Sequence, residues 1–325
     1  MTTQNNVLLI GGTGFLGYFA VQALLARDWR ITAVGLPPEP PADLFPASVK
    51  IVLKNIDTAS DEELLGLLTG HTALVYAAGM DDRVLPKRPS YPKLYHANVE
   101  IPLRLFRLAV QAGVQRAVVL GSYFSYFNRV WPEKKLDERH PYIRSRIEQE
   151  KQLTSIDGLE VCVLELPYVF GAFPVPGWKP LWAPLISYIG SMKTIFYMTG
   201  GTACVSARTV GQAVLSALER GKAGEFYPIG DENLTWTEML VRLARVGGWQ
   251  IRVIPLPNWL ISLVLNGIWF FHWLQGRESG LDPRFLTPLQ TAKTYLDPEP
   301  SRSALGYQTE GLDEAFRETV AACQR

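Results

Sequence analysis

Apolar runs and segments of helical spacing alternate along the first two thirds of the chain. Short apolar runs, which are typical of buried strands, lie at 7–10, 29–36, 49–53, 73–76, 116–120, 161–166 and 224–229. Between them lie segments with apolar residues at helical spacing, such as 98–113, which stops at a glycine, and a further helical pattern covers 205–218. Strands that alternate with helices in this way predict an α/β fold with a parallel sheet covered on both faces.

The stretch VLLIGGTGFLG, from Val7 to Gly17, combines a strand, a glycine turn and the start of a helix. Its glycines fit two registers, Gly12-x-Gly14-x-x-Gly17 and Gly11-x-x-Gly14-x-x-Gly17. Glycines let the backbone approach a phosphate, and a helix N-terminus supplies N–H groups and partial positive charge. The stretch therefore predicts a site for a dinucleotide pyrophosphate, and a purely structural turn is the alternative.

The second strand ends at Gly35 and Leu36, where dinucleotide folds place an acid that selects NAD or an arginine that accepts NADP. Neither residue type is present, and the proline-rich segment PPEPPADLFP follows. Glu39 or Asp43 could reach back to the ribose, although a surface loop is the plainer interpretation. The choice between NAD and NADP stays open.

Candidate chemistry follows the ends of the fourth and fifth strands. Ala77-Ala78-Gly79 comes directly after the fourth strand, and the small side chains allow a ligand to approach the backbone. The fifth strand runs into GSYFSY at 121–126, and HPYIRSRIEQE follows at 140–150.

In order and spacing, these pieces resemble an extended or atypical short-chain dehydrogenase/reductase of the NAD-dependent epimerase/dehydratase family. The resemblance covers nearly the whole chain, and its matching pieces are the glycine motif, Asp57, Ala77-Ala78-Gly79, Asn98, Ser122, Tyr142-x-x-x-Arg146, LPYVFG at 166–171 and the stretch 297–307. It implies a doubly wound, Rossmann-type parallel sheet with a smaller, mostly C-terminal substrate domain. The expected division is an NAD(P)-binding domain of residues 1–171 and about 203–232, and a substrate-binding region of 172–202 and 233–325.

The resemblance also implies roles for individual residues. Tyr142 is the expected general acid/base, Ser122 holds the substrate oxygen, and Asn98 supports its helix and a water relay. Arg146 stands where the family has a lysine that lowers the tyrosine pKa and binds the ribose. Arginine can supply the charge but is effectively never deprotonated, so a working enzyme and a fold that has lost its chemistry both remain open.

The implied cofactor is NAD or NADP. The residues expected to contact it are Gly11, Gly12, Thr13, Gly14, Phe15, Leu16, Gly17, Leu36, Ile56, Asp57, Ala77, Ala78, Gly79, Arg146, Pro167 and Val169.

The charge balance and the spacing of cysteines and histidines limit the classes of partner that we expect. The 32 Lys+Arg nearly balance 31 Asp+Glu and no dense basic run occurs, so nucleic acid is not an expected partner. Cys162, Cys204 and Cys323 lie far apart and the four histidines are scattered, which gives no metal-binding spacing. The polar start MTTQNN is not a signal peptide, and a cytoplasmic protein with reduced thiols is expected.

The segment 172–200 is rich in aromatic residues, and its only charges are Lys179 and Lys193. The resemblance places the substrate lid here, and a nucleotide-sugar diphosphate would require more cations. We therefore expect a carbonyl or alcohol of a hydrophobic small molecule as substrate. A non-catalytic dinucleotide-binding sensor or partner protein and a sugar-nucleotide epimerase or dehydratase are the alternatives.

The segment 257–274, PNWLISLVLNGIWFFHWL, contains no Asp, Glu, Lys or Arg. We interpret it first as core of the substrate region or as a dimer surface, since family analogy makes a homodimer unsurprising. Contact with a membrane surface is the second interpretation. A spanning helix is least favoured because Pro257, Gly267 and several polar residues interrupt the segment.

Overall fold

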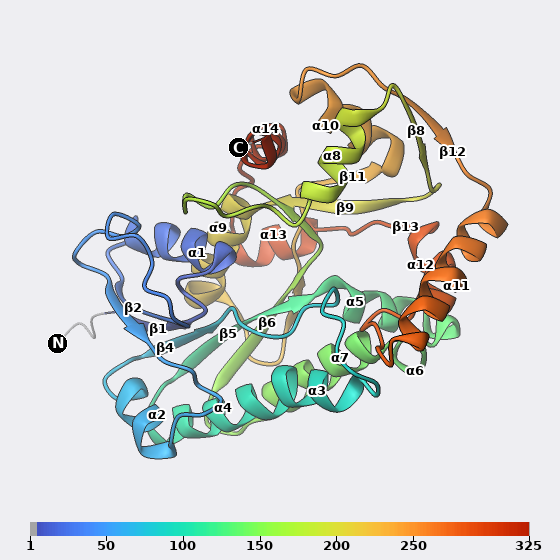
Figure 1. Cartoon of the computed structure of the whole chain (residues 1–325). Coiled ribbons are helices and arrows are strands. Elements are labelled where there is room, and N and C mark those ends of the chain that lie inside the picture. The colour runs from blue at the N-terminus through green and yellow to red at the C-terminus, as the bar shows by residue number, and fades with distance from the viewer. Residues whose placement is uncertain (1–4, 325) are drawn as a thin grey trace.

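A seven-stranded parallel sheet runs through the larger part of the molecule (Figure 1). The computed structural model describes residues 5–324; Met1–Gln4 of the polar N-terminal segment, and Arg325, lie outside the described residues. The sheet has the order β10-β6-β5-β4-β1-β2-β3. Its strands are β1 (Asn6–Ile10), β2 (Arg30–Gly35), β3 (Lys50–Leu53), β4 (Ala73–Tyr76), β5 (Arg116–Ser122), β6 (Glu160–Leu166) and β10 (Phe226–Pro228). The prediction of a doubly wound parallel sheet is confirmed.

Helices cover both faces of this sheet. One face carries α1 (Phe15–Leu25), α9 (Ala207–Arg220) and α13 (Glu299–Leu305), and the other carries α2 (Asp61–Leu68), α4 (Ile101–Gln111) and α7 (Pro141–Thr154). Val7 and Leu9 pack into the first layer, whereas Leu8 and Ile10 pack into the second. Because both faces are buried, the strands have continuous apolar runs rather than alternating ones.

Two helix predictions need correction. The helix expected at 98–113 starts earlier, as α3 (Tyr91–Tyr95) followed by a π-helical turn (His96–Glu100) and α4, so Asn98 lies inside the turn and does not open a helix. The helix expected at 205–218 is preceded by β9 (Gly201–Ser206), and α9 begins only at Ala207. Its first turn is capped by the Ser206 hydroxyl, which accepts the Thr209 N–H.

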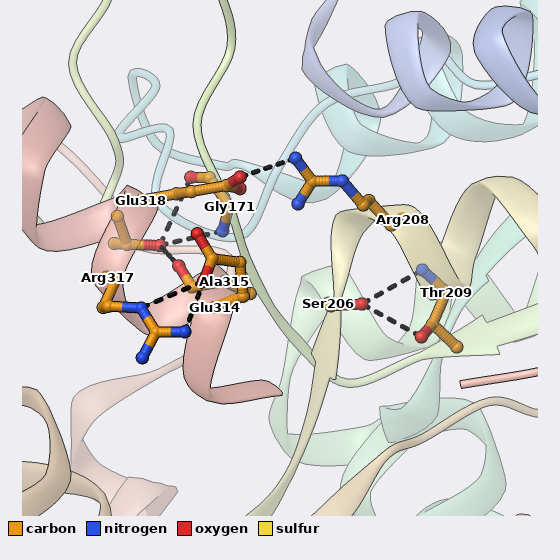
Figure 2. Close-up of polar contacts among 9 residues, drawn as sticks. Gly171, Ser206, Arg208, Thr209, Glu314, Ala315, Arg317 and Glu318 are labelled. Carbon is orange, nitrogen blue, oxygen red and sulfur yellow. Dashed lines mark hydrogen bonds and ion pairs between the residues drawn. The ribbon is translucent and has the colours of Figure 1, made fainter. Parts of the chain in front are cut away.

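A smaller, mostly C-terminal region packs beside the sheet domain. Its elements are β7 (Tyr168–Phe170), α8 (Ala183–Ser191), β8 (Thr194–Tyr197), β9, β11 (Glu232–Thr235), α10 (Trp236–Val246), β12 (Arg252–Pro255), β13 (Lys293–Thr294) and α14 (Leu312–Gln324). The other short elements are α5 (Tyr123–Val130), a 3-10 turn (Pro132–Lys134), α6 (Leu136–Arg139) and α12 (Pro283–Gln290). Figure 2 shows one junction with the sheet domain, where Arg208 of α9 pairs with Glu318 of α14.

The segment 257–274 forms α11 (Asn258–Leu274) at an edge of the molecule (Figure 1). Its interpretation as core is wrong, because Ile261 is its only buried residue and Trp259 is 68% exposed. The apolar composition was read correctly, but the neighbouring elements cover only one side of the helix. None of the helices within residues 5–324 combines the length and apolar character that a membrane crossing requires.

Candidate active site

The glycine turn forms a tight backbone cradle between β1 and α1. Gly11 has φ +80°, and a Cβ there would lie 2.6 Å from the Ala77 carbonyl oxygen. A Cβ on Gly17 would overlap the Gly11 carbonyl oxygen. Helix α1 begins after Gly14 with no side-chain cap and no acid in its first turn, so its N–H groups are available to an anion. The cradle fits a dinucleotide pyrophosphate.

The end of β2 leaves no room for a side chain at position 35. A Cβ on Gly35 would overlap the Thr13 hydroxyl oxygen, so Thr13 of the glycine turn occupies the space that a side chain at 35 would need. Leu36 is 61% exposed, and Glu39 and Asp43 are exposed in the loop that follows. Contact with Thr13 therefore excludes an acid at position 35, whereas the exposed position 36 carries a leucine.

A cavity of about 390 Å³ opens where β1, β4, β5 and β6 end. It brings together many of the residues predicted from the sequence, namely Phe15, Leu16, Ala77, Ala78, Gly79, Ser122, Tyr142, Arg146, Pro167 and Val169. The predicted residues that do not line it are Gly11, Gly12, Thr13, Gly14, Gly17, Leu36, Ile56, Asp57 and Asn98. Parallel strands present their carboxyl ends at one edge, which is where α/β folds bind ligands.

Tyr142 and Arg146 lie one turn apart on α7 and face this cavity. The Arg146 guanidinium carbon lies 6.0 Å from the centre of the Tyr142 ring, and its Nη2 donates to the Leu120 carbonyl oxygen. Burial raises the pKa of Tyr142 above its usual value, whereas the Arg146 charge and the neighbouring Ser122 hydroxyl lower it. The Arg146 and Ser122 side chains therefore both act on the Tyr142 phenol.

Asn98 lies behind the cavity and is fully buried. Its Oδ1 accepts the Met80 N–H at 2.7 Å, and its Nδ2 donates to the Met80 carbonyl and to Ser145 Oγ, both at 3.1 Å. The Ser145 hydroxyl donates in turn to the Tyr142 carbonyl oxygen at 2.8 Å. Asn98 thus joins the loop after β4 to the helix that carries Tyr142.

Asp57 and Ile56 lie after β3, outside the lining of the cavity. Asp57 Oδ1 is 2.9 Å from His96 Nε2, and His96 Nδ1 is 2.7 Å from Glu100 Oε2. These two carboxylates raise the pKa of His96, with the Glu100 hydrogen bond as the larger cause. Ile56 packs against the core beneath the sheet.

Two carboxylates that the sequence reasoning missed also face the cavity. Asp81 and Asp82 follow Gly79 after one intervening residue, Met80, and Asp81 pairs with Arg83. Burial, and then the charge of Asp81, raise the pKa of Asp82 above its usual range. Burial opposes ionisation of Asp81 as well, but its hydrogen bonds with Arg83 bring its pKa below the usual value. Their position within three residues of the Ala-Ala-Gly turn was the available signal.

A larger cavity, of about 970 Å³, lies elsewhere, between α1, α9, α14 and the segment 172–179. Arg208 and Glu318, drawn in Figure 2, are on its wall. None of the catalytic or cofactor-binding residues predicted from the sequence lines it, although its segment 172–179 belongs to the predicted lid. The smaller cavity is therefore the candidate active site.

The fold and site together are those of an extended short-chain dehydrogenase/reductase. The defining features are a parallel sheet, a glycine cradle after β1, a serine at the end of β5, and a tyrosine on α7 that lines the same cavity. The model of the NAD dependent epimerase/dehydratase family matches residues 7–230, and the chain belongs to this family. The resemblance read from the sequence is confirmed, and the description of the family names NAD, one of the two cofactors that the resemblance implied.

Solved structures of similar fold include proteins of different description. The crystal structure of gox2253 has a TM-score of 0.79 at 20% identity, with 98% of each chain covered. PA4631, a nucleoside-diphosphate-sugar epimerase from Pseudomonas aeruginosa, has a TM-score of 0.71 at 18% identity, with 98% of this chain and 97% of that chain covered. MoeE5 in complex with UDP-glucuronic acid and NAD has a TM-score of 0.66 at 18% identity, with 99% of each chain covered. At these identities the likeness concerns the fold. A comparison with curated proteins finds no match.

Proposed function

We propose that the chain is an NAD(P)-dependent oxidoreductase that reduces or oxidises a carbonyl or alcohol of a hydrophobic small molecule. The observation that carries the proposal is the meeting of Tyr142, Ser122 and Arg146 at one cavity, beside the N-terminus of α1. A structural tyrosine and a solvated arginine would not require this convergence, since Arg146 is only 5% exposed.

The dinucleotide would be held by the glycine turn at its pyrophosphate, and by Arg146, Gly79 and Val169 near its nicotinamide end. When bound, the cofactor supplies the two-electron redox chemistry. The glycine cradle supports this assignment, because side chains at Gly11 or Gly17 would fill it. Leu36, Ile56 and Asp57 stay proposed contacts of the adenosine end.

Tyr142 moves the proton in this proposal. Its phenol donates a proton to the substrate oxygen during reduction and accepts one during oxidation. The Arg146 charge favours the phenolate, and Ser122 Oγ orients the substrate oxygen toward the phenol. Asn98 is a positioning residue, since it bonds Met80 in the loop after β4 and Ser145 on α7 and does not line the cavity.

The cavity lining favours a neutral, apolar substrate. The side chains that supply aromatic and aliphatic surface around the reacting end are Tyr123, Phe124, Tyr168, Leu181 and Trp182. The carboxylates of Asp81 and Asp82 are on the same wall, and the neighbouring Arg83 is paired with Asp81. A substrate diphosphate would meet these carboxylates at close range, which is unfavourable.

A sugar-nucleotide epimerase is the second candidate. The observation that favours it is family membership, together with similar folds whose descriptions name UDP-sugars and NAD. Retention of NAD through purification and conversion of a UDP-sugar would support this candidate. A non-catalytic dinucleotide-binding protein would bind cofactor and turn over neither substrate class.

The first experiment is titration with NADH and with NADPH, followed by nicotinamide fluorescence, for wild type and Arg146→Ala. Weaker binding in the variant supports Arg146 at the ribose. Failure of wild type to bind either cofactor contradicts the oxidoreductase proposal.

Turnover is then measured on hydrophobic aldehydes and ketones and on UDP-glucose, for wild type, Tyr142→Phe and Tyr126→Phe. We expect Tyr142→Phe to bind cofactor but lose carbonyl turnover by roughly 100-fold or more. Tyr126→Phe is the matched control, because Tyr126 does not line the cavity. Equal loss in both variants would contradict the role given to Tyr142.

A further inference from the structure

Helix α11 presents an unusually large apolar surface. It packs on α12 through one side, where Ile261 is buried and Ser262 Oγ bonds Thr287 Oγ1 at 3.0 Å. The other sides carry large apolar side chains that are each at least 40% exposed: Trp259, Leu263, Val264, Ile268, Phe270, Phe271, Trp273 and Leu274. A contiguous patch of this kind on a folded protein marks a surface that meets a partner or a membrane.

The exposed side chains extend around more than half of the helix circumference, at 100° per residue. A helix that pairs with one other helix needs only a narrow apolar stripe. A broad, convex apolar ridge is instead what a helix presents when it lies in the boundary between lipid headgroups and acyl chains. Asn266 on this ridge donates its amide to the Ser262 carbonyl, so its polar group is satisfied within the helix.

Three cations surround the C-terminal end of α11. Lys87 and Arg277 sit opposite each other in an antiparallel bridge, and the Arg88 N–H donates to the Gly276 carbonyl. The Arg88 guanidinium carbon lies 5.5 Å from the centre of the Trp273 ring. Within residues 5–324, none of the three cations is in an ion pair.

Acidic groups near this end do not neutralise the cluster. Glu278 follows the bridge, and its carboxylate accepts the Ser90 N–H. Asp282, farther along, is paired with Arg284. The cluster therefore keeps a net positive charge beside the aromatic end of α11.

These charges distinguish a membrane from a second copy of the chain. In a parallel two-fold pairing of α11, the cation clusters of both copies would meet. In an antiparallel pairing, each cluster would meet the N-terminal end of the other helix, which carries partial positive charge and no acid in its first turn. An anionic lipid surface instead attracts the cations, while tryptophan side chains suit the headgroup boundary.

We propose that α11 lies in the surface of an anionic phospholipid membrane, with its apolar ridge toward the acyl chains and Lys87, Arg88 and Arg277 at the headgroups. The proposal rests on the exposed helix and its cations, and it does not depend on the proposed catalytic function. The backbone carbonyl of Gly280, shortly after α11, accepts the Tyr142 N–H at 2.9 Å, so the docked face would be joined to the candidate active site.

The test is co-sedimentation of the full chain with vesicles of phosphatidylcholine alone and with added phosphatidylglycerol. We expect wild type to bind the phosphatidylglycerol vesicles. In the double variant Trp259→Ser/Phe271→Ser, the affinity for these vesicles should fall by roughly tenfold or more. Leu53→Ser is the matched control, because Leu53 is 36% exposed at the end of β3 and should leave vesicle binding unchanged.

The charge contribution has its own variant pair. Lys87→Gln/Arg277→Gln should lower binding to phosphatidylglycerol vesicles by about fivefold per charge removed. Lys151→Gln/Arg245→Gln removes two exposed cations elsewhere and should have little effect. Equal losses in the two pairs would show a general charge effect and contradict the docking geometry.

Two measurements keep the test decisive. Quenching of wild-type tryptophan fluorescence by brominated lipid requires no variant and is expected on binding. Sedimentation equilibrium without lipid tests the second copy: a dimer that Trp259→Ser/Phe271→Ser dissociates would overturn the proposal, as would wild type that fails to bind vesicles at any phosphatidylglycerol content.

Discussion

Replacement of Asn98 by alanine tests the link between the loop after β4 and the helix of Tyr142. The fully buried amide makes three hydrogen bonds, two to the backbone of Met80 and one to Ser145. Alanine removes all three and leaves the Met80 groups without these partners. At about 1 kcal/mol for each net hydrogen bond, we expect the free energy of unfolding to fall by about 3 kcal/mol.

Ser145→Ala calibrates this figure. This variant removes the two hydrogen bonds of the Ser145 hydroxyl, one from Asn98 Nδ2 and one to the Tyr142 carbonyl oxygen. The free energy of unfolding should fall by about 1–2 kcal/mol. Because the two side chains are in contact, the double variant should be less destabilised than the sum, by about 1 kcal/mol. Cofactor binding should weaken in Asn98→Ala more than in Ser145→Ala, since Gly79 and Met80 line the cavity.

The assay is urea unfolding followed by circular dichroism, with NADH titration of each folded variant. An Asn98→Ala variant that unfolds within about 0.5 kcal/mol of wild type would refute the reasoning, because a surface substitution has an effect of that size. The same refutation follows if Ser145→Ala costs more than Asn98→Ala.

Three further predictions concern pH, electrostatics and the glycine cradle. Burial lowers the pKa of His140 to about 4, so the neutral form favours folding and the protein loses stability as the pH falls from about 6.5 to about 4. In His140→Gln, the free energy of unfolding should therefore fall by about 3 kcal/mol less between pH 7 and pH 4 than in wild type, as measured by urea unfolding at the two pH values. Asp82→Asn removes a charge that raises the pKa of Tyr142, so the acidic limb of kcat/KM for alcohol oxidation should move to lower pH, by up to about one unit; an unmoved profile would contradict their coupling. Gly17→Ala should abolish NADH binding in fluorescence titration, whereas Gly66→Ala, with open space around its Cβ, should not; retained binding in the first variant would argue against the cradle.

The sheet was predictable from the sequence because its strands are buried on both faces. The run at 73–76 matches β4, and the run at 161–166 matches β6 to within one residue. The glycine turn was predictable too, since backbone contact between Gly11 and Gly17 leaves no room for side chains. In both cases the sequence signal and the structural requirement are local.

Features that depend on tertiary contacts were not predictable in this way. The π-helical turn at Asn98 accompanies bonds to Met80 and Ser145, which lie 18 and 47 residues away. Asp82 gains its significance only because α7 brings Tyr142 to the end of β4. The apolar segment of α11 was evident, but its exposure depends on how little of the helix the neighbouring elements cover.

The surroundings of Arg146 suit a guanidinium, at the position where the sequence resemblance led us to expect a lysine. Glu150 lies one turn farther along α7 and is buried; burial and the charge of Glu165 raise its pKa, whereas the charge of Arg146 lowers it. Arg129 bonds Glu165 at 2.7 Å and lies 3.7 Å from Glu150. A buried lysine in this place could lose its proton, but arginine keeps its charge. We infer that the permanent charge of Arg146 serves the Tyr142 phenol and the buried Glu150 carboxyl together, so the departure from lysine is compatible with a working acid/base pair.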